Sequence, residues 1–159
     1  MFQSKNKTIY EIKAPLSGTV IPLEQIRDNV FSQKILGSGA AVIPSDNLVL
    51  SPVDGTIMQI SDTGHLYTIE TAEGICILIH IGIGTASLPA GSIKSFVMAG
   101  QSVRAGNVLA QADLEKIRSY GIDLCTPVVI TGDESVHITE CTEGSCTGGE
   151  TVILQYTQV

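Results

Sequence analysis

Hydrophobic and polar positions alternate in short runs along most of the chain, and glycine, proline, serine, aspartate or asparagine separates one run from the next. Short runs rich in valine, isoleucine and threonine are typical of β-strands. The pattern therefore predicts a mostly-β chain. The predicted strands cover residues 8–13, 19–22, 40–44, 48–50, 56–60, 66–70, 75–83, 108–110, 126–131, 136–140 and 152–156, with one more short strand inside 100–106.

Helical patterns are rare. Residues 113–121 begin with an acidic residue, place Leu114 and Ile117 three positions apart and end in glycine, so they predict a short peripheral helix. A helical turn is also expected within residues 23–30. The glycine-rich stretch 143–149 is expected to be a loop.

The clearest hairpin lies between Gly64 and Thr85, where a turn at residues 71–74 separates two strand-like runs. If this loop is even and centred on Ala72 and Glu73, His65 pairs with His80. Directly opposed residues share a face with Cβ atoms roughly 4.5–5.5 Å apart, so both imidazoles would reach one reacting atom. A one-residue bulge would instead move one ring diagonally away or onto the other face.

The second run of this hairpin alternates strictly. Isoleucine occupies every odd position from 75 to 83, which predicts a packed interior row. Cys76, Leu78 and His80 face the other way. His80 is followed by Gly82 and Gly84, which leave room for a visiting molecule.

The length of the chain limits the number of domains it can form. A chain of 159 residues with 43% hydrophobic side chains suits one domain, expected at residues 8–159 after a flexible tail at 1–7. Within it the segment APLSGTV at 14–20 recurs as SPVDGTI at 51–57. The echo fits a duplicated hairpin architecture, and it fits equally two similar turns chosen for the same backbone reasons.

Charge and composition limit the partners. The net charge of −7 disfavours nucleic acid and anionic membranes, and the 4% aromatic content without tryptophan argues against a base-stacking surface. A polar start and the lack of a membrane-length apolar run predict a cytoplasmic protein. The four cysteines are then expected as reduced thiols.

Two neutral imidazoles on one face allow two kinds of chemistry. One ring can act as a nucleophile while the other donates a hydrogen bond to a bound anion, or both can bind a metal such as zinc. If a backbone carbonyl holds Nδ1–H of His80, its Nε2 carries the free lone pair. If Thr63 orients His65, that second ring can donate to phosphoryl oxygens; spacing alone also allows Thr63 to be a simple turn residue.

Several blocks between Ile9 and Tyr156, in order, closely resemble the glucose-specific enzyme IIA family of the bacterial phosphoenolpyruvate-dependent sugar phosphotransferase system. They are APLSGTV, NVFSQKILGSGAAVIP, SPVDGTI, the T-x-H of Thr63 and His65, LIHIGIGT around His80, AGQSVRAGNVL and TPVVIT. Pattern and resemblance together predict an all-β antiparallel sandwich, barrel-like and built from a duplicated motif, with one or two short peripheral helices.

The resemblance implies a phosphocarrier that has a phosphohistidine intermediate and needs no cofactor. His80 takes a phosphoryl group at Nε2 from the phosphorylated histidine phosphocarrier protein and passes it to a cysteine of an enzyme IIB domain. His65 stabilises that group and Thr63 orients His65. An apolar face around the site, implied to dock these partners, matches Val30, Phe31, Ile35, Leu36 and Leu78, and Asp28 matches an acidic position that faces an arginine of the donor. Without the resemblance, Phe31 is a core residue and Asp28 a solvated surface carboxylate.

Three positions depart from the family pattern. Gly84 stands where an acidic residue is usual, residues 89–93 replace a familiar Gly-x-Gly-Phe, and Ser61 replaces an apolar residue two positions before Thr63. These changes leave the phosphate chemistry intact and reduce the docking surface. We therefore expect altered partner choice or affinity and slower transfer.

Three other functions compete. A zinc peptidase of the LytM type would need an H-x-H pair, whereas His137 stands alone in VHI. A biotinyl or lipoyl carrier would need a modifiable lysine at a hairpin tip, and neither repeated turn has one. A regulatory module that binds partners through the same face without carrying phosphate stays open.

Overall fold

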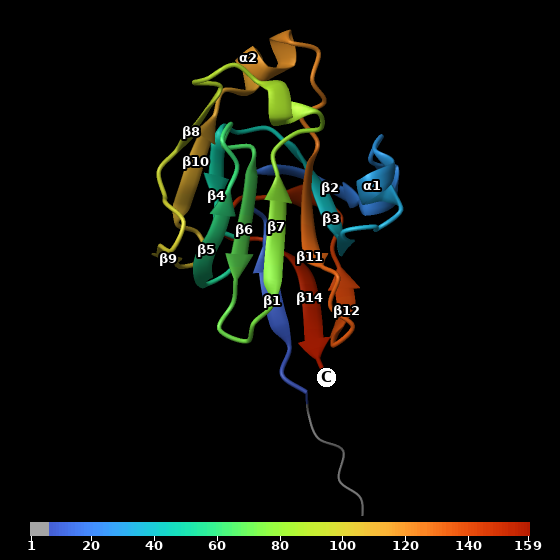
Figure 1. The fold of residues 1–159 in the computed structure, drawn as a ribbon. Helices are drawn as coiled ribbons and strands as arrows, with labels where there is room; N and C mark the ends of the chain where they lie inside the picture. Colours follow the sequence, from blue (N-terminus) through green and yellow to red (C-terminus); the bar gives the residue numbers. More distant parts are fainter. Residues whose placement is uncertain (1–6) are drawn as a thin grey trace, which may run out of the picture.

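Three antiparallel sheets build the molecule in the computed structural model, which describes residues 7–159. The largest has eight strands in the order β13-β2-β3-β11-β7-β6-β5-β9, and the two small sheets have the orders β1-β14-β12 and β4-β10-β8 (Figure 1). The predicted all-β antiparallel sandwich is therefore confirmed. The strands are β1 Tyr10–Lys13, β2 Gly18–Pro22, β3 Gly37–Pro44, β4 Leu48–Leu50, β5 Gly55–Ile60, β6 Leu66–Glu70, β7 Cys76–His80, β8 Ile93–Ser95, β9 Ser102–Val103, β10 Val108–Ala112, β11 Thr126–Thr131, β12 Val136–Cys141, β13 Gly144–Cys146 and β14 Val152–Gln158.

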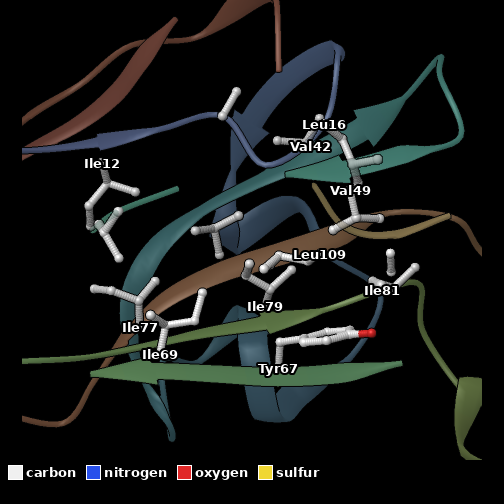
Figure 2. Packing of buried hydrophobic residues seen from close by; sticks show 14 of the residues in the cluster. Ile12, Leu16, Val42, Val49, Tyr67, Ile69, Ile77, Ile79, Ile81 and Leu109 are labelled. Carbon is white, nitrogen blue, oxygen red and sulfur yellow. The ribbon is translucent and has the colours of Figure 1, made fainter. Parts of the chain in front are cut away.

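The main core lies between the eight-stranded sheet and the two small sheets. Strands of all three sheets contribute fully buried aliphatic side chains to it, together with Tyr67 of β6 (Figure 2). Ile75, Ile77, Ile79 and Ile81 are each at most 1% exposed, so the predicted interior row is confirmed as far as Ile81.

A second, smaller cluster covers the outer face of the eight-stranded sheet. It is formed where η1 (Leu23–Gln25) and α1 (Asn29–Ser32) lie over β3, β11 and β7, and Figure 1 shows α1 beside β2 and β3. This outer cluster consists of Leu23, Ile26, Phe31, Ala41, Leu78, Cys125 and Val129. Leu78 of β7 is buried in this outer cluster. His80, two residues further along the strand, therefore lies on the same face, at the edge of the cluster.

The two sequence echoes occupy equivalent places. Lys13 N–H donates to Pro52 O at 3.0 Å, and Leu50 N–H donates to Pro15 O at 2.7 Å, so each turn bonds to the other in the same way. A repeated segment that meets its own copy through reciprocal bonds is expected of a duplicated motif related by a two-fold axis. The structure thus favours duplication over two unrelated turns.

The predicted helix at 113–121 is α2 (Leu114–Ser119), whose first turn is capped by the carboxylate of Asp113. The turn expected within 23–30 is η1, and α1 begins inside the same range, at Asn29, and ends two residues beyond it, at Ser32. A second 3-10 helix, η2 (Thr85–Ser87), follows the hairpin. No helix among residues 7–159 combines the length and apolar character needed to cross a membrane.

The loop prediction for residues 143–149 is wrong in part, because β13 lies within it and pairs with β2. Three residues of low strand propensity pair there because an existing strand edge supplies the hydrogen-bond partners, which local sequence cannot reveal. Of the tail expected at 1–7, residues 1–6 lie outside the described residues.

Candidate functional site

The hairpin of β6 and β7 has a different register from the one predicted. Leu66, not His65, pairs with His80, because the loop is odd instead of even, with residues 72–74 between the bonded pair Thr71 and Ile75. Thr71 N–H bonds to Ile75 O, and Gly74 closes the turn in a left-handed conformation with φ of 83°. Three-residue hairpin loops favour this arrangement, in which the last loop residue is left-handed. The predicted direct pairing of the two histidines is therefore wrong.

The two imidazoles nevertheless meet. Their ring centroids are 4.9 Å apart with an angle of 72° between the planes. His65 lies just before β6, directly after Gly64 with φ of 73°, so the alternation of a regular strand does not fix its direction. Its carbonyl still accepts a hydrogen bond from Ile81 N–H at 2.7 Å, which ties it to the end of β7. A local turn thus brings together what strand pairing alone would separate.

His80 is held by a backbone carbonyl. Its Nδ1 lies 2.6 Å from Gly82 O, and because a carbonyl oxygen only accepts, Nδ1 carries the proton. The Nε2 atom then has a free lone pair. Gly82 can present this carbonyl because it adopts φ of 74°, and a Cβ there would lie 2.8 Å from Thr85 Cγ2 and 3.0 Å from Asp123 O. Only glycine fits this position without displacement of its neighbours.

His65 is held by two hydroxyl groups. Thr63 Oγ1 contacts its Nδ1, as the resemblance implied, and Ser61 Oγ lies 3.0 Å from the same nitrogen. Sequence reasoning treated Ser61 only as a lost apolar position. The available signal was its spacing, because a serine four residues before a histidine across a tight turn can fold back onto the ring.

Burial makes both rings neutral near pH 7. Desolvation lowers the pKa of His65, and the neighbouring His80 lowers it further. Desolvation also lowers the pKa of His80, while the hydrogen bond to Gly82 and the carboxylate of Asp28 act in the opposite direction. These last two groups therefore stabilise any positive charge that develops on the His80 ring.

The segment that includes α1 provides the groups beside His80. Asp28 caps the helix by accepting a hydrogen bond from Val30 N–H at 2.9 Å, which fixes its carboxylate near the site. The ring of Phe31 lies 5.3 Å from the His80 ring in an edge-on arrangement. Phe31 is also 5% exposed and belongs to the outer cluster, so it packs beneath the histidine as a core residue would.

The expected docking residues divide into two groups. Val30, Ile35 and Leu36 are exposed by 41%, 65% and 40%, which is unusual for three large apolar side chains so close in sequence. Phe31 and Leu78 are buried below them. Three exposed apolar side chains thus lie in and just after α1, the helix whose Phe31 contacts the His80 ring.

The rim at Gly84 is open. This residue has φ of 80°, and a Cβ there would meet no heavy atom within 4 Å. The acidic residue that the resemblance led us to expect would therefore meet no clash, although this left-handed backbone strains any residue with a Cβ. With glycine at this position the chain lacks that negative charge, and no packing contact is lost.

The described residues offer few ligands for a metal ion. Zinc in proteins is almost always four-coordinate. Within residues 7–159 no group of three or more histidine, cysteine, aspartate or glutamate side chains lies together as metal ligands. The imidazoles of His65 and His80 would supply two of the four ligands, and a zinc ion there would need further ligands from outside the described residues.

The remaining candidate groups lie elsewhere. His137 is on β12, in a different sheet from the histidine pair. Cys76, Cys125, Cys141 and Cys146 are free thiols, and burial raises the pKa of each, that of Cys125 to about 11. They are weak nucleophiles near neutral pH.

Comparison with known proteins gives consistent matches. A family model described as phosphoenolpyruvate-dependent sugar phosphotransferase system, EIIA 1, matches residues 10–136. A PTS system glucose-specific EIIA component of Haemophilus influenzae is 36% identical over 156 residues, which cover 97% of this chain and 94% of that protein. A glucose-specific EIICBA component of Streptococcus pneumoniae is 40% identical over 126 residues, covering 79% of this chain and 17% of that protein. Glucose permease IIA from Mycoplasma capricolum is similar in structure, with a TM-score of 0.89 and 30% identity over 93% of this chain and 96% of that one.

Proposed function

Because this chain belongs to the EIIA 1 family of the phosphoenolpyruvate-dependent sugar phosphotransferase system, we propose that it is a phosphocarrier with His80 as its phosphoryl acceptor. His65 stabilises the bound group, and Thr63 orients His65. The single observation that carries this assignment is the bond from His80 Nδ1 to Gly82 O, which leaves Nε2 as the free nucleophile.

The transfer balances without a metal or a water molecule. The phosphorus–nitrogen bond of the donor phosphohistidine breaks, and its electron pair returns to the donor nitrogen. A new bond forms from the Nε2 lone pair of His80 to phosphorus. The positive charge that develops on the ring is shared with Nδ1–H, where the carbonyl of Gly82 and the carboxylate of Asp28 stabilise it.

The onward step reverses this sequence. A cysteine thiolate of the acceptor attacks phosphorus, and the electron pair of the breaking bond returns to Nε2. The ring is then neutral and ready for another cycle. Two transfers through the Nε2 lone pair require that His80 hold no permanent extra proton, which is the state that burial favours near pH 7.

The partners follow from family and surface. An EIIB domain is the proposed acceptor, and the relative named EIICBA component supports it. The histidine phosphocarrier protein is the proposed donor. Both would dock on the apolar surface of Val30, Ile35 and Leu36 beside the histidine pair, with Asp28 facing a basic group of the donor.

The test is phosphorylation from phosphoenolpyruvate. Wild-type protein, His80→Gln and His65→Gln are each incubated with enzyme I and the histidine phosphocarrier protein, and the adduct is located by mass spectrometry under neutral conditions. We expect an acid-labile phosphoryl group on His80 of the wild type and none on His80→Gln. We expect His65→Gln to accept the group and to pass it poorly to an EIIB domain.

Two results would overturn the proposal. An unmodified wild type would identify a purely regulatory binding module, and a labelled His80→Gln would move the acceptor elsewhere. Unchanged onward transfer by His65→Gln would remove only the role assigned to His65.

A further inference from the structure

We propose that Ser61 is a second positioning residue for His65, acting together with Thr63 to keep the proton of that ring on Nε2. The inference deepens the proposed function, because it concerns how the ring beside the phosphoryl acceptor is oriented. Both hydroxyl groups converge on Nδ1 of His65, Ser61 at 3.0 Å.

The hydrogen bonds of Ser61 indicate which way its hydroxyl donates. Its Oγ accepts a hydrogen bond from Leu66 N–H at 3.1 Å, so one of its lone pairs is already engaged. Its own hydroxyl hydrogen remains to be given, and Nδ1 of His65 is an acceptor within reach. A ring whose Nδ1 accepts a hydrogen bond carries its proton on Nε2.

Ser61 is well placed for this role because the turn fixes it at three points. Its N–H donates to Leu66 O at 3.1 Å, its carbonyl accepts from Gly64 N–H at 2.9 Å, and its Oγ accepts from Leu66 N–H. The side chain therefore has little freedom to swing away from the ring. Thr63 lies inside the turn that Ser61 closes, so the two hydroxyls are brought to one nitrogen by the same local structure.

The two rings then have opposite tautomers. Gly82 O fixes the proton of His80 on Nδ1 and leaves Nε2 as a nucleophile. Ser61 and Thr63 fix the proton of His65 on Nε2 and make that atom a donor. With centroids 4.9 Å apart, a phosphoryl group on one ring can receive a hydrogen bond from the other. Nucleophile and donor are thus assigned by different neighbours.

Because the hydroxyls of Ser61 and Thr63 share one acceptor atom, we expect each to compensate in part for the loss of the other. Loss of either hydroxyl leaves one donor to Nδ1 of His65. Loss of both leaves nothing to keep the ring proton on Nε2. A single neutral hydrogen bond contributes about 0.5–1.5 kcal/mol, so Ser61→Ala alone should slow onward transfer by roughly two- to tenfold at 1.4 kcal/mol per tenfold change. The double variant Ser61→Ala/Thr63→Ala should be slower than the product of the two single effects.

The decisive readout is the 15N NMR spectrum of the His65 ring in unphosphorylated protein. Wild type and both single variants should show a pyridine-type Nδ1 and a pyrrole-type Nε2. In the double variant both signals should move toward the opposite tautomer, whereas Ser61→Thr/Thr63→Ala, which keeps one hydroxyl beside Nδ1, should keep the wild-type spectrum. Ser119→Ala, which removes an exposed hydroxyl on α2, is the matched control.

This design separates the possible failures. A purely structural role of Ser61 would lower the melting temperature through the lost bond to Leu66 and leave the ring tautomer of the double variant unchanged, which would overturn the inference. A double variant that keeps the wild-type spectrum and transfer rate would do the same. If the wild type accepts no phosphoryl group, the proposed function fails, and the nitrogen shifts still decide the role of Ser61.

Discussion

The two faces of β7 differ in the side chains they carry and in what those side chains contact, although the strand has only five residues. Its inward face carries Ile77 and Ile79, both fully buried in the main core, while its outward face carries Cys76, Leu78 and His80, which meet the outer cluster and solvent. The inward face is uniform because packing tolerates only apolar volume. The outward face is heterogeneous because each position there meets something different, and it carries His80, the proposed phosphoryl acceptor.

The comparison predicts that stability and transfer can be changed separately, and Ile77→Ala should give the largest effect. Removing a fully buried isoleucine side chain costs about 2–5 kcal/mol, and Ile77 is 0% exposed. Denaturant unfolding measures this loss, with Cys76→Ala on the outward face as the neighbouring control. The account fails if Cys76→Ala costs as much, or if phosphoryl uptake by folded Ile77→Ala molecules falls.

Gly82→Ala should give the second largest effect, and this effect should fall on the outward face. Its left-handed backbone costs about 1–2 kcal/mol for a residue with a Cβ, and contacts with Thr85 and Asp123 add to this. The carbonyl that holds His80 should also shift and slow phosphoryl uptake. Gly84→Ala is the matched control, because φ there is 80° and the space is open. Equal losses in the two variants would contradict the crowding argument.

The pH dependence tests whether the outward face is desolvated. Because burial lowers the pKa of His80 below its usual 6.5, uptake should be constant from pH 8 to 6.5 and should fall about tenfold per pH unit below the folded-state pKa. Between the folded-state pKa of His80 and its unfolded value near 6.5 the unfolded chain binds more protons, so stability should fall as the pH drops through that range. An NMR titration midpoint of His80 above 6.5 would contradict this.

The smallest expected effect concerns the exposed segment after α1. Lys34 is the one non-glycine residue among those described with a positive φ, 57°, and it ends the helix through bonds from Lys34 N–H to Phe31 O and Ile35 N–H to Val30 O. Lys34→Gly should raise the free energy of unfolding by about 0.5–1 kcal/mol. Gln33→Gly, at φ of −92°, should lower it. The reverse order would show that no strain is stored there.

The sequence predicted the inward face better than the outward one. Alternation in residues 75–81 identified the interior row directly, because burial acts on every second residue of a strand. The hairpin register was missed by one residue because the loop was taken as even and centred on Ala72 and Glu73. Gly74 held the signal, since a two-residue loop needs residues that tolerate positive φ, and neither Ala72 nor Glu73 does.

The site shows the same division. The motif identified His80, His65 and Thr63 as candidates, and the contacts of Thr63 and of a backbone carbonyl with the two rings were anticipated. Ser61 was not, because its contact depends on how the turn before β6 folds back. The pairing of β13 with β2 was also missed, since it joins segments far apart in the chain.

The central claim is that Nε2 of His80, on the outward face of β7, carries the phosphoryl group. Phosphorus–nitrogen correlation NMR of protein labelled with 15N-histidine and phosphorylated through the histidine phosphocarrier protein measures this directly. The account predicts one phosphorus signal coupled to Nε2 of His80, with Nδ1 still protonated and bonded to Gly82 O. Coupling to Nδ1 of His80, or to either nitrogen of His65, would contradict it.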